Sequence, residues 1–210
     1  MSGTTGFFMD ERCFWHFGGS YAFMAPVRGY VQPMIAGGLP ENPETKRRLV
    51  NLLRVTGLID RLAVASAPPA TTEDLRRCHP APYLDEFERL SDAGGGELGL
   101  RTPFGHGGFE IAAQSAGLVK ATLAAVLNGE HATAYALSRP PGHHCLPDTP
   151  MGFCLLANAA IAIEAALAAG LAERIAVIDW DVHHGNGTEH IFARNVPLLD
   201  RHASLAMTES

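Results

Sequence analysis

Two short stretches of the sequence each carry a pair of adjacent histidines among residues that suit proton or metal chemistry. The first is RPPGHHCLPDTPMGFC, residues 139–154, and the second is DWDVHHGNGT, residues 179–188. Neutral imidazole titrates near physiological pH, so His143 and His144 could take a proton from water and return it to a leaving group. This chemistry requires that the two stretches meet in space.

The second stretch also places two carboxylates beside its histidines. On a strand, alternate side chains share a face, so Asp179, Asp181 and His183 would point the same way. Carboxylate and imidazole groups both bind zinc at about 2 Å, which makes this group a candidate metal site. Two protein ligands do not complete a tetrahedral site, and a catalytic zinc takes three plus water, so the sequence must supply another residue or the site is partial. The alternative is a buried polar network. Asp179 and Asn186 are the candidates to orient the imidazoles of the first pair.

A βαβ unit is expected to bring the two stretches together. TAYALS, residues 133–138, is typical of a strand, residues 154–170 of an Ala-rich buried helix, and RIAVIDWD, residues 174–181, of an apolar strand. A right-handed crossover makes the two strands parallel, so both end at the same edge of the sheet. In open parallel sheets the ligand crevice lies outside the carboxyl ends of the strands, where both histidine pairs follow.

Glycine and proline divide the rest of the chain into loops and helices. Gly- and Pro-rich stretches predict loops, and near-helical spacing of apolar residues predicts the helices between them. The expected elements are a long loop over 18–45, a helix within 46–62 that Gly57 ends, two short helices over 71–90 broken at Pro80 and Pro82, a glycine-rich loop over 92–108, and a helix over 109–130 that stops at Asn128. We expect a single α/β domain.

The composition of the 210 residues is that of an ordinary globular protein. Hydrophobic residues make up 47% and charged residues 18%, and the net charge of -6 argues against direct binding to nucleic acid. Asp10 and Glu11 interrupt the N-terminus before an apolar run of signal-peptide length, and no later stretch is expected to span a membrane. We therefore expect a cytoplasmic protein. The four cysteines form no CxxC pair, so we expect reduced thiols. No G-x-S-x-G or H-E-x-x-H motif is present, which disfavours serine hydrolases and thermolysin-type zinc enzymes.

Together these motifs resemble histone deacetylases and the related acetylpolyamine amidohydrolases, closest to the class II and bacterial deacetylase-like branch. The resemblance runs from ENPETKRRLVNLL through RPPGHH, MGFC and DWDVHHGNGT to about Phe192. It implies an arginase-like α/β fold, which is an open parallel sheet flanked by helices. It also implies a zinc-dependent deacetylase that hydrolyses the acetyl amide of acetylated lysine, polyamine or similar amines.

The resemblance implies metal ligands in the second stretch. Asp181 and His183 match two of the three zinc ligands of the family. Asp179 matches an aspartate that helps to bind a structural potassium ion and that also holds His143. The expected cofactors are therefore Zn²⁺ and, at Asp179, K⁺.

The resemblance also implies catalytic and substrate-binding residues. His143 and His144 match the pair that contacts the reactive water, and His144, partnered by Asn186, matches the proton shuttle. Gly152 and Phe153 match the floor and wall of a narrow tunnel for the acetyl-lysine-like stem.

Two further residues are assigned on other segments. The loop over 92–108 would lie at the tunnel rim, where Glu97 could meet an incoming cationic substrate. Arg47 matches an arginine below the site.

The resemblance stops near the end of the chain. After Phe192 the family continues into a strand, a third zinc-binding aspartate and a tyrosine that polarises the acetyl carbonyl, whereas this chain reads ARNVPLLDRHASLAMTES. We therefore expect a deacetylase-like domain over 1–192, incomplete at its C-terminus, and a divergent tail over 193–210 that results from a shifted reading frame. Asp200 and His202 could replace missing ligands, although the family pattern does not place them at the site.

Three functions are open from the sequence. The first is the deacetylase acting on an acetylated amine. The second is an inactive truncated remnant of such an enzyme, or a non-catalytic binding fragment. The third is arginase-like chemistry on guanidino groups, which shares the fold but which RPPGHH argues against. A sheet edge exposed by truncation would favour homo-oligomers.

Overall fold

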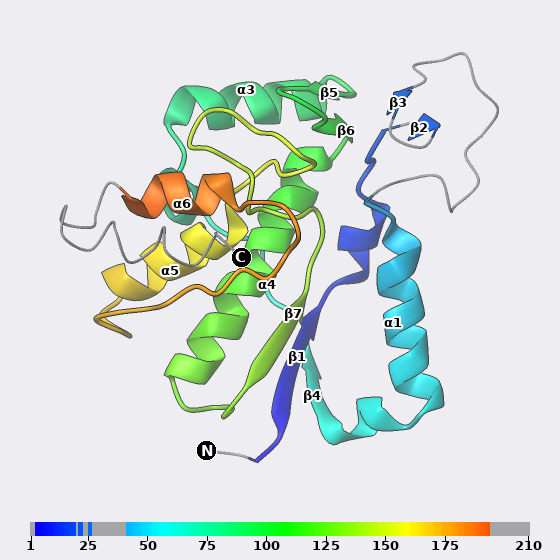
Figure 1. Ribbon diagram of the computed structural model, residues 1–210, viewed down its shortest axis with the longest axis vertical. Helices are drawn as coiled ribbons and strands as arrows, with labels where there is room; N and C mark the ends of the chain where they lie inside the picture. Colours follow the sequence, from blue (N-terminus) through cyan, green and yellow to red (C-terminus); the bar gives the residue numbers. More distant parts are fainter. Residues whose placement is uncertain (1–2, 20, 23–24, 27–40, 194–210) are drawn as a thin grey trace.

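The computed structural model describes residues 3–19, 21–22, 25–26 and 41–193 (Figure 1). Most of the loop expected over 18–45 lies outside the described residues. So do residues 194–210 of the expected tail, with the candidate ligands Asp200 and His202.

A three-stranded parallel sheet forms the centre of the fold, in the order β4-β1-β7 (Figure 1). Its strands are β4 Leu62–Ala65, β1 Thr5–Met9 and β7 Ala134–Leu137. In the register, Phe8 of β1 lies between Ala65 of β4 and Ala136 of β7. Phe7 and Phe8 point to opposite faces and both are buried, so both faces of the central strand are covered.

Helices cover the sheet. α4, Gly108–Leu127, packs on β1 and β7, and α5, Asn158–Ala168, packs on α4. α1, Pro43–Val55, contributes Val50 to the core around β1. The remaining elements are η1 Glu11–Trp15, β2 Tyr21–Ala22, β3 Ala25–Pro26, η2 Leu58–Arg61, α2 Thr72–Arg76, α3 Ala81–Asp92, β5 Gly95–Glu97, β6 Pro103–Gly105 and α6 Asn186–Ala193.

α4 is long and apolar enough to cross a membrane by length and composition, which the sequence analysis did not anticipate. In the structure Ala112, Ala113 and Ala116 of α4 belong to the core shared with α3 and α5. Leu118, further along the same helix, belongs to the core around β1. α4 is thus placed as a core helix that joins two hydrophobic cores.

The fold class and the helices agree with the sequence-based expectation, because the chain forms an α/β domain with a parallel sheet flanked by helices. α1 ends just before Gly57, which has φ of +71°. α2 and α3 are separate helices, although Pro82 lies inside the first turn of α3 and only Pro80 precedes it. The glycine-rich loop contains a short hairpin, β5 with β6.

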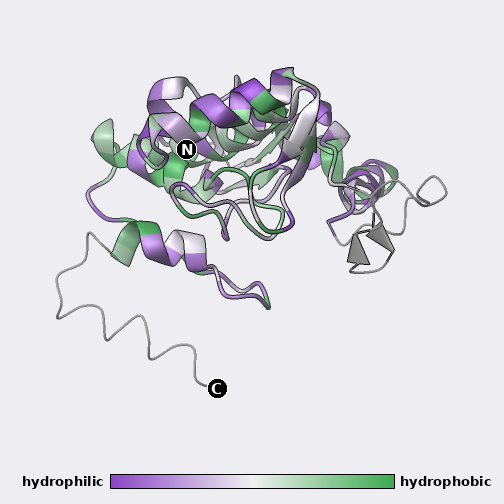
Figure 2. Cartoon of the chain, turned by 90° about the horizontal axis from the view of Figure 1, so that it is seen from above, coloured by the Kyte–Doolittle hydropathy of each residue, from purple (hydrophilic) through white to green (hydrophobic). Residues whose placement is uncertain are grey.

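One expected strand is absent from the described residues, and two strands were not expected. Residues 174–181 form no strand, so the expected βαβ unit is absent from the described residues, and β1 and β4 were not expected. Figure 2 shows the segment before α6 on one side of the molecule, beyond the strands and helices of the core. A β-strand forms only where a neighbouring strand pairs with its backbone N–H and C=O groups. No described strand pairs with residues 174–181.

Candidate active site

The two histidine stretches meet, although not through neighbouring strands. His143 lies on the loop after β7, and its carbonyl oxygen accepts the backbone N–H groups of Gly187 and Thr188, at the start of α6, at 2.9 and 3.1 Å. Gly187 permits this approach, because a Cβ there would lie 2.4 Å from the Cys145 carbonyl oxygen. The start of α6 thus fixes the second stretch on the first.

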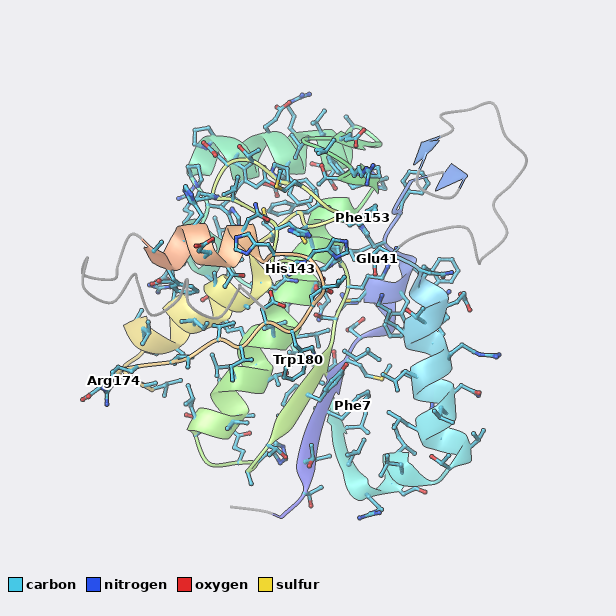
Figure 3. The ribbon with its side chains drawn as sticks, in the orientation of Figure 1. Phe7, Glu41, His143, Phe153, Arg174 and Trp180 are labelled. Atoms are coloured by element: carbon cyan, nitrogen blue, oxygen red, sulfur yellow. The ribbon has the colours of Figure 1, made fainter. Side chains whose placement is uncertain are left out.

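Each imidazole of the first pair has a hydrogen-bond partner in the second stretch. Figure 3 labels His143, which lies close to α6. His143 Nδ1 lies 2.9 Å from Asp179 Oδ2, and His144 Nδ1 lies 2.7 Å from Asn186 Oδ1. Because these oxygens accept, Nδ1 of each ring carries the hydrogen, and Nε2 of a neutral ring is the basic nitrogen. The centroids of the two rings are 4.0 Å apart, so the rings lie in contact. One ring is held by a carboxylate and the other by a neutral amide.

Asp181 and His183 form a two-donor group beside the histidine pair. Asp181 Oδ1 accepts the His183 backbone N–H at 2.8 Å and lies 2.9 Å from His183 Nδ1. The backbone bond and then the ring bond lower the pKa of the Asp181 carboxyl. The His183 ring centroid lies 5.8 Å from that of His144, so the two-donor group adjoins the histidine pair.

The donor types and spacing of this group suit a first-row divalent ion. Two ligands of a tetrahedral zinc, each about 2.1 Å from the ion, are roughly 3.4 Å apart. The 2.9 Å between Asp181 Oδ1 and His183 Nδ1 is a shorter, hydrogen-bonded separation, so an ion would replace the shared hydrogen and move the two atoms slightly apart. Within the described residues no group of three His, Cys, Asp or Glu side chains could hold one ion, and the ligand roles expected for Asp181 and His183 stay predictions. The potassium role expected for Asp179 stays a prediction.

Gly152 lies against the ring of His144, and Phe153 follows it. Both residues have left-handed backbone φ, of +55° and +68°, and a Cβ at Gly152 would lie 2.4 Å from His144 Cδ2. Their backbone N–H groups donate to the carbonyl oxygens of Leu100 and Arg101 at 2.9 and 2.8 Å. The glycine-rich loop therefore lies directly against this wall of the site.

Glu97 and Arg47 have their described contacts elsewhere. Glu97 Oε1 accepts the backbone N–H of Thr102 at 3.2 Å within its own hairpin loop, so its rim role stays a prediction. Arg47 pairs with Glu44 of α1 and lies over the Trp15 ring, 5.4 Å from its centroid. The contacts of Arg47 are thus with α1 and η1 rather than with the histidines.

The sequence analysis missed a buried arginine, Arg139, which is the first residue of RPPGHH. Its side chain is 0% exposed, pairs with Glu41 and donates to the His16 carbonyl oxygen at 2.7 Å. Burial lowers the pKa of this guanidinium, and the Glu41 carboxylate partly offsets that effect. The ion pair anchors the start of the loop that carries His143, and the only sequence signal was its place in that motif.

A second missed residue is His79, which is buried between α2 and α3. Its Nδ1 lies 2.7 Å from the Pro147 carbonyl oxygen, and its Nε2 accepts the backbone N–H of Ala157 at 3.0 Å. Burial lowers the pKa of His79 to about 4. The neutral ring of His79 therefore joins the connection between α2 and α3 to two points of the loop that runs from the histidine pair to α5.

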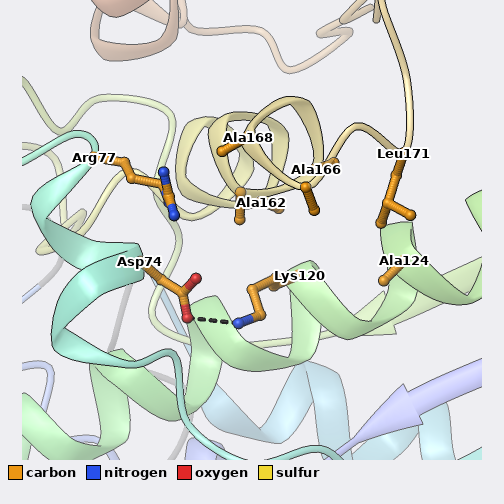
Figure 4. Close-up of a pocket in the computed structure, with 10 residues that line it drawn as sticks. Asp74, Arg77, Lys120, Ala124, Ala162, Ala166, Ala168 and Leu171 are labelled. Atoms are coloured by element: carbon orange, nitrogen blue, oxygen red, sulfur yellow. Dashed lines mark hydrogen bonds and ion pairs between the residues drawn. The ribbon is translucent and has the colours of Figure 1, made fainter.

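A groove of about 270 Å³ lies between α2, α4 and α5 (Figure 4). Alanines of α4 and α5 line it, and the ion pair of Asp74 with Lys120 lies at its wall. None of the residues assigned to the site lines this groove, so it is not the catalytic cavity.

The sequence matches the histone deacetylase domain over residues 39–206, which extends past residue 192. Because this match covers most of the chain, the chain belongs to the histone deacetylase family. It is 60% identical over 199 residues to a histone deacetylase-like amidohydrolase of Pseudomonas aeruginosa, covering 95% of this chain and 52% of that protein. It is also 38% identical over 158 residues to a probable deacetylase of Archaeoglobus fulgidus, covering 73% of this chain and 44% of that protein.

A solved structure supports the same assignment. The crystal structure of the HDA15 HD domain matches with a TM-score of 0.80 and 31% identity, over 92% of this chain and 52% of that one. The expected deacetylase-like α/β fold is thereby confirmed. The chain spans about half the length of these relatives.

Proposed function

We propose that this chain provides the proton-transfer residues and two zinc ligands of a deacetylase that hydrolyses the amide bond of an acetylated amine. The observation that carries the proposal is the pair of oriented imidazoles, His143 and His144, next to the two-donor group of Asp181 and His183. The relatives described as an amidohydrolase and as a probable deacetylase support the reaction class.

The two imidazoles divide the proton work. His144 is held by the neutral amide oxygen of Asn186, so its Nε2 can take a proton from water and return it to the departing amine. His143 is held by the carboxylate of Asp179, which fixes the orientation of that ring beside His144. A hydrogen carried by its Nε2 would stabilise the negative charge that develops on the carbonyl oxygen.

Asp181 and His183 would hold the zinc ion. When bound, Zn²⁺ polarises a carbonyl group and lowers the pKa of water. The hydrogen bond between the two side chains, which a bound ion would replace, brings Asp181 Oδ1 and His183 Nδ1 together beside the His144 ring. The remaining zinc ligand would come from outside the described residues.

The wall beside His144 limits the shape of the substrate. Gly152 lies directly against the ring and has no side chain, and Phe153 follows it with an aromatic one. Such a wall suits a narrow, unbranched stem, which an acetylated lysine side chain or an acetylated polyamine provides.

A chimera tests this function within a complete domain. Residues 1–193 replace the segment of the P. aeruginosa amidohydrolase with which they align, and acetate release from an acetyl-lysine peptide is measured with and without a zinc chelator. We expect acetate release that chelation removes and that His144→Ala reduces by about 10²–10⁴-fold. His184→Ala is the matched control, because that exposed ring bonds Glu189 instead.

Two results would reject the proposal. One is a folded chimera that releases no acetate. The other is equal activity of the His144→Ala and His184→Ala variants, since that would show that His144 takes no part in proton transfer.

A further inference from the structure

The side-chain amide of Asn186 contacts two different groups through its two ends. Its Oδ1 accepts the hydrogen of His144 Nδ1 at 2.7 Å, and its Nδ2 donates to the thioether sulfur of Met151 at 3.2 Å. A thioether sulfur accepts hydrogen bonds weakly and has no hydrogen to donate. Met151 therefore favours the orientation of the amide that turns Oδ1, rather than Nδ2, toward His144.

The backbone of Met151 holds this sulfur in place. Met151 forms a parallel bridge with Leu100, and its carbonyl oxygen accepts the backbone N–H of Cys154 at 2.9 Å. Gly152, the next residue, donates its N–H to the Leu100 carbonyl oxygen at 2.9 Å and lies against the His144 ring. The segment that forms the wall beside His144 therefore also places the thioether beside the partner of that ring.

The two imidazoles of the first pair differ in their need for such a residue. The partner of His143 is the carboxylate of Asp179, and both of its oxygens accept, so either orientation leaves the hydrogen on Nδ1 of the ring. The partner of His144 is an amide with one accepting and one donating end. If this amide turned over, its Nδ2 would donate to His144 Nδ1, and the hydrogen of the neutral ring would move to Nε2. A ring in that state cannot take a proton at Nε2.

We infer that Met151 is a positioning residue for proton transfer. Through Asn186, its thioether keeps the hydrogen of the neutral His144 ring on Nδ1 and leaves Nε2 free to accept a proton. This inference rests on the function proposed above, because it concerns the proton shuttle of the same site. Because the thioether acts only through the amide, a change at Asn186 separates this role from packing.

Nitrogen NMR of the chimera described above measures the position of this hydrogen directly. Long-range proton–nitrogen correlation spectra with isotope-labelled histidine distinguish the two tautomers of a neutral ring, and the signal lost in His144→Ala identifies His144. At about pH 8, where an unperturbed imidazole is neutral, we expect the tautomer with the hydrogen on Nδ1. The other tautomer in the folded wild type would overturn the inference without any change at Met151.

Met151→Leu removes the acceptor and keeps most of the side-chain volume. We expect both tautomers of His144 in comparable amounts, because a leucine favours neither end of the amide. Acetate release should fall about twofold, in proportion to the remaining Nδ1 tautomer. Met9→Leu is the matched control, because Met9 is a partly buried methionine that packs against the core around β1. It should keep the wild-type spectrum and rate.

Asn186→Asp separates positioning from packing. A carboxylate accepts at both ends, so Asn186→Asp added to Met151→Leu should return the His144 hydrogen to Nδ1, as Asp179 does for His143. A methionine that only packs would leave the tautomer of His144 unchanged when it is replaced. A single Nδ1 tautomer in folded Met151→Leu would therefore overturn the inference, and so would a mixture that Asn186→Asp does not remove.

The outcomes distinguish this inference from the proposed function. A folded chimera that releases no acetate but shows the expected tautomers in the wild type and in Met151→Leu supports the positioning role and rejects the function. An active chimera in which Met151→Leu leaves the tautomer of His144 unchanged overturns the positioning role alone.

Discussion

Gly152 and Gly170 have similar left-handed backbone conformations, with φ of +55° and +67°, but only Gly152 faces His144. A Cβ at Gly152 would lie 2.4 Å from His144 Cδ2, whereas nothing lies within 4 Å of a Cβ at Gly170. We expect Gly152→Ala and Gly170→Ala each to lower the free energy of unfolding by about 1–2 kcal/mol through backbone strain. Only Gly152→Ala should also slow acetate release by the chimera, on the order of 10–100-fold.

Urea unfolding measures the first effect in both variants, and acetate release measures the second. Equal rates of acetate release in the two variants would contradict the placement of Gly152 against the ring of His144.

The orienting partners in the site could be predicted from the sequence, because Asp179 and Asn186 both belong to a motif that had to meet the first histidine pair. The structure shows the expected hydrogen bonds, while the catalytic roles stay predictions. The buried pair of Arg139 with Glu41 could not be predicted. Its members are 98 residues apart, and Glu41 adjoins a segment without helical or strand periodicity.

At the scale of elements, His79 joins the connection between α2 and α3 to the loop before α5. Its pKa is about 4 in the folded chain, against about 6.5 when the chain is unfolded. The unfolded chain therefore binds the proton first as the pH falls. The stability that this neutral ring contributes is fully present above about pH 6.5, is lost as the pH falls to about 4, and changes no further below that value.

We expect the wild-type chain to lose roughly 3 kcal/mol of unfolding free energy through His79 over this range, and His79→Gln to lack that loss. Urea unfolding of both proteins between about pH 7 and pH 4 measures the difference in slope. His16, whose pKa burial lowers to about 3, is common to both proteins and cancels in the comparison. Parallel stability curves would contradict a neutral, buried His79.

Helices were easier to predict than strands, because helical periodicity is local. β1 and β4 were not expected, whereas β7, which is as short as β4, was. Residues 174–181 have the pattern of a buried strand and yet form none in the described structure. Strand pairing depends on segments far away in the chain, and a local pattern does not contain them.

At the scale of the whole molecule, the described structure has two hydrophobic cores, and only one of the two active-site loops packs into a core. Leu118 lies in the core at the sheet, and Leu155 lies in the core beside α4. The loop of the first histidine pair is anchored in the second core through Cys145, which is 0% exposed. Among the described residues of the two cores, none comes from 174–183, so the hydrogen bond of Asp179 with His143 holds the segment of Asp181 and His183 to the other loop.

Zinc binding by the folded chimera that contains residues 1–193 is the most direct measurement, made by competition with a chromophoric chelator. The geometry predicts binding through Asp181 and His183, which His183→Ala weakens by about 10–100-fold or more. His184→Ala should bind zinc like the wild type, because the ring of His184 lies 2.7 Å from Glu189 and outside the two-donor group. If the folded wild type binds no zinc, or if His183→Ala binds it as tightly, the paired motifs do not form a zinc site.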